Sequence, residues 1–117
     1  MPTAILLASM LMALAPPSLD RAVSVEVAAN DYYCSRTAGI ALRVADNDAD
    51  ADLADAANMV RQYAHQQLQQ RVVQPQGDVQ AAHVLGDRLT QQLVARYSRS
   101  GARAVLADAL VGCAESL

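Results

Sequence analysis

Residues 25–45 of the chain read VEVAANDYYCSRTAGIALRVA. Apolar residues recur in this stretch at every third or fourth position, which is the spacing of one face of an α-helix. The side chains on this face are Val27, Cys34, Ala38, Ala41 and Ala45, with Leu42 beside them. We therefore predict a helix whose buried face consists of small side chains around one cysteine.

Three further stretches of the chain show the same helical period. We predict helices over about 52–72, 79–99 and 102–114, and no run with period two is long enough to predict a strand. The side chains predicted to face the core are Leu53, Ala57, Val60, Ala64 and Leu68, then Ala82, Leu85, Leu89, Leu93 and Tyr97, and finally Leu106, Ala109, Leu110 and Cys113. Together these segments predict an all-α fold, a compact bundle of about four helices over residues 25–117.

The two cysteines, Cys34 and Cys113, are predicted on the buried faces of the first and last of these helices. Exported proteins with two cysteines usually pair them, so we expect one disulfide between the two ends of the domain. A link that closes a loop of about 80 residues stabilises a fold by about 4 kcal/mol on chain-entropy grounds. The disulfide matters for stability here because large core side chains are scarce: 24 of the 117 residues are alanine, and the chain has neither phenylalanine nor tryptophan.

The start of the chain has the pattern of an export signal. Residues 4–15 read AILLASMLMALA, an apolar run that is too short to span a bilayer, which takes about 20 residues. The run ends in Ala13-Leu14-Ala15, the small-x-small pattern that a signal peptidase recognises. The alternative is a buried N-terminal helix. We expect a signal peptide over 1–15, an extended segment over 16–24, and a periplasmic or secreted product with no stable membrane insertion.

The charge of the chain argues against nucleic-acid binding. The net charge is −3, and a nucleic-acid partner requires a basic surface. The charge is unevenly distributed, since residues 1–59 hold eight acidic and three basic residues, whereas residues 60–117 hold four acidic and six basic residues. Two halves of opposite sign predict either attraction between them or separate acidic and basic faces.

The run from Asp46 to Asp52 places aspartates at alternate positions and suggests a calcium loop. An EF-hand loop beginning at Asp46 would have Ala51 where the invariant glycine belongs and Ala57 where the bidentate glutamate belongs. We therefore predict an acidic turn in which Asp50 or Asp52 caps the following helix, and we expect no metal and no cofactor.

His83 and Asp87 are four residues apart and share one face of the third predicted helix. The pair has the chemistry of two metal ligands or of an acid–base couple. An ordinary surface pair accounts for the same spacing, and no serine or cysteine has an evident histidine partner nearby. A small periplasmic enzyme or metal-binding protein that uses His83 and Asp87, or the Asp46–Asp52 run, stays an alternative, and we expect no catalytic site.

A stripe of larger side chains lies opposite Cys34 on the first predicted helix. Tyr32, Arg36 and Arg43 form this stripe, and tyrosine and arginine often anchor protein interfaces. The alternative is an ordinary solvated face. We predict that the stripe points outward and take it as the candidate surface for a protein partner.

These observations favour an exported, non-catalytic helical binding module. One version is an inhibitor or immunity-type protein of the bacterial envelope, because such a protein needs export, durability and a binding surface but no active site. A structural or stress-related envelope protein is a further alternative.

Overall fold

The computed structural model describes residues 21–73 and 78–117. Within these residues the chain forms β1 (Arg21–Val23), α2 (Val25–Asp48), α3 (Ala51–Gln70), β2 (Arg71–Val73), α4 (Val79–Ser100) and α5 (Arg103–Ser116). Four helices packed together confirm the predicted all-α bundle in this part of the chain. The predicted signal peptide at 1–15 lies outside the described residues.

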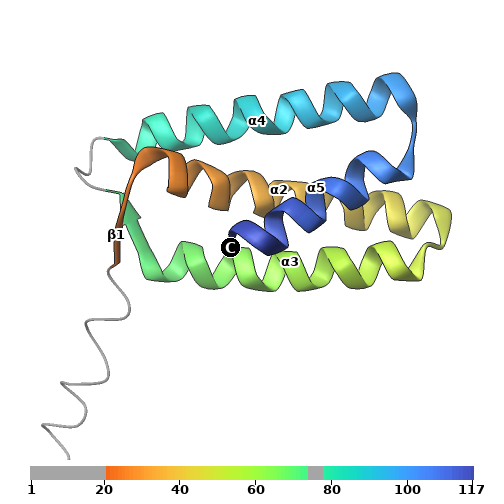
Figure 1. Ribbon diagram of the computed structural model, residues 1–117, viewed down its shortest axis with the longest axis horizontal. Coiled ribbons are helices and arrows are strands. Elements are labelled where there is room, and N and C mark those ends of the chain that lie inside the picture. The colour runs from red at the N-terminus through yellow and green to blue at the C-terminus, as the bar shows by residue number, and fades with distance from the viewer. Residues whose placement is uncertain (1–20, 74–77) are drawn as a thin grey trace, which may run out of the picture.

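The helix α2 occupies the centre of the bundle and packs against the other three helices. Figure 1 shows α2 and α4 running in one direction while α3 and α5 return in the other. Alanines at 38, 41 and 45 are fully or almost fully buried on α2. Such small side chains let neighbouring helices approach closely. The larger buried side chains of the core are a few leucines, among them Leu53, Leu93 and Leu106.

The disulfide joins α2 to α5 as predicted. Cys34 and Cys113 are bonded, both are buried, and their Cα atoms lie 5.6 Å apart. The two residues are 79 positions apart, so the bond links the first and last helices of the bundle. Val27, predicted on the buried face of the first helix, is instead 39% exposed near the start of α2.

A pair of short strands closes one end of the bundle, where the sequence predicted no strand and wrongly continued the second helix to residue 72. β1 and β2 pair in parallel, with Val23 opposite Val73. Val73 is buried in a small second cluster with Ala28 of α2 and Ala82 of α4. Strands of three residues are too short to show an alternating pattern, which explains why periodicity missed them.

Side chains cap the starts of α2 and α3, whereas α4 and α5 begin without a side-chain cap. The Ser24 hydroxyl accepts a hydrogen bond from the backbone N–H of Val27, and the Asp50 carboxylate accepts one from Leu53. At the far ends, Ala49 after α2 and Gly101 after α4 adopt left-handed backbone conformations that stop each helix. No helix within 21–73 and 78–117 combines the length and the apolar composition needed to cross a lipid bilayer.

Candidate binding surface

An apolar groove of about 160 Å³ lies between α3 and α5. Its deepest side chains, Leu53, Val60 and Leu110, are also buried members of the core. Above them Met59 of α3 is 47% exposed and Val111 of α5 is 57% exposed. The remaining apolar lining consists of Ala56, Ala107 and Ala114.

The groove exists because the apolar face of α3 and that of α5 are each wider than the surface that neighbouring helices cover. Met59 precedes the core residue Val60, and Val111 follows the core residue Leu110. A residue next to the core stripe is turned by about 100° around the helix axis, so it lies at the edge of the contact and not inside it. Two such edges face the same hollow and leave apolar side chains in contact with water, which is unfavourable unless something covers them.

One end of the groove is held by an ion pair. The Arg103 guanidinium at the start of α5 donates to both carboxylate oxygens of Asp50 in the turn between α2 and α3. These hydrogen bonds from Arg103, together with the backbone N–H of Leu53, hold the pKa of the Asp50 carboxyl below its usual value. The carboxylate in turn raises the pKa of Arg103. The pair therefore stays charged at neutral pH and fixes the start of α5 to the turn.

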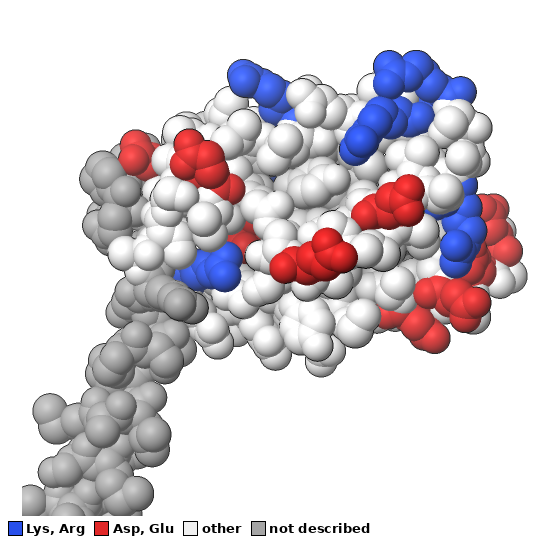
Figure 2. All heavy atoms as spheres, in the orientation of Figure 1, with Lys and Arg blue, Asp and Glu red and all other residues white. Residues whose placement is uncertain are grey.

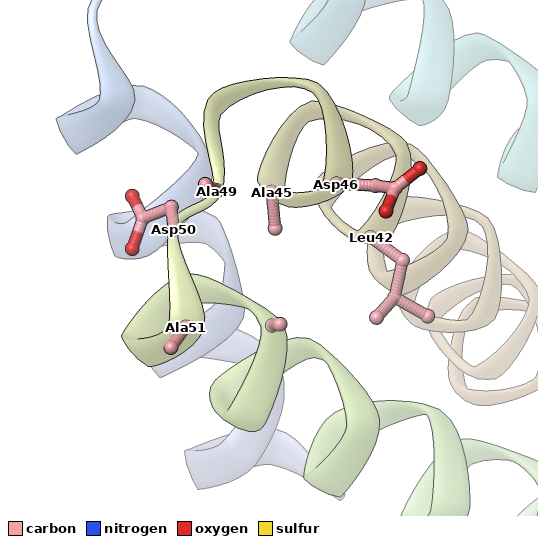
Figure 3. A pocket seen from close by; sticks show the side chains of 7 residues that line it. Leu42, Ala45, Asp46, Ala49, Asp50 and Ala51 are labelled. Carbon is pink, nitrogen blue, oxygen red and sulfur yellow. The ribbon is translucent and has the colours of Figure 1, made fainter.

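The aspartate-rich turn forms a second hollow, of about 440 Å³, drawn in Figure 3. The carboxylates of Asp46 and Asp50 point in opposite directions there, and Asp48 and Asp52 are exposed. Among the described residues, no group of three or more histidine, cysteine, aspartate or glutamate side chains is placed to hold a metal ion. The calcium alternative thus gains no support from the geometry, whereas the predicted cap at Asp50 is confirmed.

This second hollow is larger than the groove but offers a ligand less contact. Alanines at 45, 49, 51 and 54 form most of its lining, and Ala49 and Ala51 are exposed. Dispersion and burial energies scale with the number of atoms brought into contact. The groove, lined by leucine, methionine and valine, is therefore the stronger candidate for a binding surface despite its smaller volume.

The stripe of Tyr32, Arg36 and Arg43 does not point outward as predicted. Tyr32 stacks on His83 of α4, and the Arg36 guanidinium lies 5.9 Å from the centre of the Tyr32 ring. Both side chains are half-buried because α4 packs on this side of α2, and only Arg43 is exposed. The sequence could not indicate that α2 is covered on two sides. Partner binding by these three residues stays a prediction.

The candidate pair His83 and Asp87 is divided between two structural contacts. Asp87 forms an ion pair with Arg36 at 2.7 Å, while the His83 ring stacks on Tyr32. Within the described residues, the contacts of His83 and Asp87 are thus made to α2 and not to each other. The two side chains therefore connect α4 to α2.

A buried ion pair between α2 and β2 was not predicted. The Arg71 guanidinium donates to Asp31 at 2.9 Å, and the Asp31 side chain is 1% exposed. The second carboxylate oxygen of Asp31 has no hydrogen-bond partner among the described residues. Burial raises the pKa of the Asp31 carboxyl, while the charge and hydrogen bond of Arg71 oppose that rise. This pair attaches the strand end of the bundle to its central helix.

Comparison with known proteins finds no match to any family model, to any curated protein or to any solved structure. Functional inference therefore depends on the surface itself. Sequence periodicity did not identify Met59 and Val111, which define the groove, because both lie beside the apolar stripes and not within them. An apolar residue directly beside a stripe residue was the signal that could have found them.

Proposed function

We propose that this protein is an exported, non-catalytic binding domain that docks another protein in the apolar groove between α3 and α5. The observation that carries the proposal is the exposure of Met59 and Val111 over a groove with almost entirely apolar lining. Protein interfaces commonly have an apolar centre with a polar rim. Methionine suits such a centre because its flexible side chain adapts to the shape of a partner.

A binding role also agrees with how the polar side chains are used. Asp50 and Asp87 pair with arginines, and His83 stacks on a tyrosine. Each of these groups serves to hold two elements together, so none is left as an evident acid, base or metal ligand. This pattern supports a protein that acts through its surface.

The proposed compartment is the periplasm or the outside of the cell. Disulfides form and persist in oxidising environments, and the Cys34–Cys113 bond is compatible with such a place. The apolar run at residues 4–15 supplies the export signal in this proposal. An inhibitor or immunity-type protein is the version we favour, because it requires a durable exported scaffold with one docking surface.

Site-specific photo-crosslinking in the producing cell tests the docking surface. A photoreactive phenylalanine analogue replaces Val111 in the groove or, as a matched control, Val84, an exposed valine on α4 outside the groove. We expect a discrete crosslinked adduct from position 111 and none from position 84. The proposal fails if position 111 gives no adduct, or if both positions give the same adducts.

A further inference from the structure

The groove between α3 and α5 is bordered on both sides by carboxylates. Asp52 and Asp55 are exposed on α3, and Asp108 and Glu115 are exposed on α5. On α3, Asp55 is three residues from Asp52 and four residues from Met59, so all three share one helix face. Each apolar wall of the groove therefore has acidic side chains along its outer edge.

The same relation holds on α5. Asp108 precedes Val111 by three residues and Glu115 follows it by four, which places both carboxylates on the face of Val111. Asp108 and Glu115 are thus two turns apart along the solvent edge of the groove. Figure 2 shows acidic side chains across the face that carries α5 and around the α2–α3 turn, whereas basic side chains gather mostly over α4.

The arginines of α3 and α5 neutralise only a small part of this border. These helices contain two arginines, Arg61 and Arg103. Arg103 lines one end of the groove, where its guanidinium is paired with Asp50, and the nearby charge of Asp52 adds to the rise of its pKa. Arg61 is two residues from Met59 and therefore points to a different side of α3. Four carboxylates therefore border the apolar floor as an acidic rim, against one arginine, Arg103, whose hydrogen bonds go to Asp50.

We propose that the groove binds a cationic amphipathic helix of a partner protein, an inference that rests on the function proposed above. The apolar stripe of that helix contacts Met59 and Val111, and lysine or arginine side chains on its flanks face the four carboxylates. Figure 1 shows α5 inclined to α3 but running the same general way along the bundle, so a helix can lie over the hollow between them. The 14 residues of α5 correspond to a partner segment of similar length, about 21 Å.

The acidic rim disfavours the other occupants of an apolar groove. A second copy of this chain would bring two acidic borders together, and like charges at an interface are strongly unfavourable. A membrane surface rich in anionic lipid would be repelled for the same reason. Opposite charge on a partner, in contrast, both speeds association and fixes the orientation of the bound helix.

Fluorescence anisotropy with three designed peptides tests the charge of the partner. The first is a 14-residue amphipathic helix of leucine and lysine, matched to the length of α5. The second has the same leucine pattern with glutamate in place of lysine, and the third is a scrambled leucine–lysine peptide of identical composition. Each is titrated with the oxidised protein at an ionic strength of about 0.15 M, at which only short-range charge effects remain.

We expect the leucine–lysine helix to bind at least about tenfold more tightly than either of the other peptides. Exchange of Asp108→Asn together with Glu115→Gln should lower its affinity about three- to tenfold, the range for two exposed charge pairs. The matched control is Asp46→Asn with Asp48→Asn, which removes two exposed carboxylates at the α2–α3 turn. That control should change the affinity by less than about twofold.

Three results would overturn the inference. One is equal binding of the lysine and glutamate peptides, and another is no binding of the lysine peptide. The third is an equal effect of the two carboxylate pairs, which would mean general attraction to an acidic protein. Crosslinking at position 111 distinguishes these failures from a failure of the proposed function, because an adduct there would leave the docking surface in place with a partner of different charge.

Discussion

Tyr32 of α2 and His83 of α4 stack with their ring centroids 4.0 Å apart and their planes inclined by 26°. Gly86 of α4 lies beside this stack and against the backbone of α2. A Cβ atom at position 86 would lie 3.1 Å from the carbonyl oxygen of Ala29 and 3.1 Å from the Cβ of Tyr32. The absence of a side chain at Gly86 therefore lets α4 lie this close to α2.

We expect Gly86→Ala to destabilise the protein by about 1 kcal/mol, because crowding against a backbone carbonyl outweighs the higher helix propensity of alanine. Gly39→Ala is the matched control, since nothing lies within 4 Å of a Cβ at that helical position. That substitution should stabilise the protein by about 0.5–1 kcal/mol. Urea denaturation of both variants measures the two effects. A stabilised Gly86→Ala protein would show that α2 and α4 have room to separate.

The disulfide should contribute a large share of the stability. We expect Cys34→Ser, or reduction of the native protein, to lower the free energy of unfolding by about 2–5 kcal/mol. The alanine-rich core has few large side chains to offset the loss. Thiol titration of the purified protein, followed by denaturant midpoints with and without reductant, provides the measurement. Two free thiols in the native protein, or identical midpoints, would contradict the account.

The buried carboxylate of Asp31 predicts an unusual pH dependence. Its pKa in the folded protein is raised above the ordinary value of 3.8 by burial, so the folded state binds this proton more tightly than the unfolded state. The contribution of Asp31 to stability is therefore fully present below pH 3.8 and is lost as the pH rises through the folded-state pKa. The unfolding free energy of the wild type, compared with that of Asp31→Asn, should therefore be highest at acidic pH, near 3.8.

Urea denaturation of the wild type and of Asp31→Asn, from about pH 3.5 to pH 7, checks this sign. The unfolding free energy of the wild type minus that of Asp31→Asn should decline as the pH rises. If the difference instead grows in favour of the wild type with rising pH, attraction by Arg71 outweighs burial, and the pKa of Asp31 is lowered in the folded state.

The helices were predictable from the sequence because their apolar residues repeat with the helical period. Leu53, Ala57, Val60 and Ala64 are buried on α3 as expected, and Leu106, Leu110 and Cys113 are buried on α5. The same reasoning placed both halves of the disulfide on facing surfaces. Local periodicity suffices for such statements because each concerns a single helix and the side that it buries.

The arrangement of the helices around α2 was not predictable in this way. Periodicity identifies one buried face, but α2 is covered by α3 and α5 on one side and by α4 on another. For that reason Tyr32 and Arg36 were expected in solvent and are found against α4. The groove was missed for the same reason, since the exposure of Met59 and Val111 depends on how α5 crosses α3.

The export proposal predicts the N-terminus of the mature protein. Cleavage after Ala15 leaves a product that begins near Pro16. Mass spectrometry of the protein isolated from periplasmic and secreted fractions should find this shortened chain. An intact apolar N-terminus on protein recovered from the cytoplasm would contradict export and would also remove the compartment in which the disulfide is expected to persist.

The most direct test of the docking groove is the affinity of the partner captured by crosslinking at position 111. The purified partner is titrated against the wild type, Val111→Asn and Val84→Asn, after thermal melting has shown that the two variants are equally stable. We expect Val111→Asn to weaken binding at least about tenfold, because it places an amide in the apolar centre of the contact, and Val84→Asn to change it by less than about twofold. Unchanged affinity for Val111→Asn, or equal losses in both variants, would show that the partner binds elsewhere.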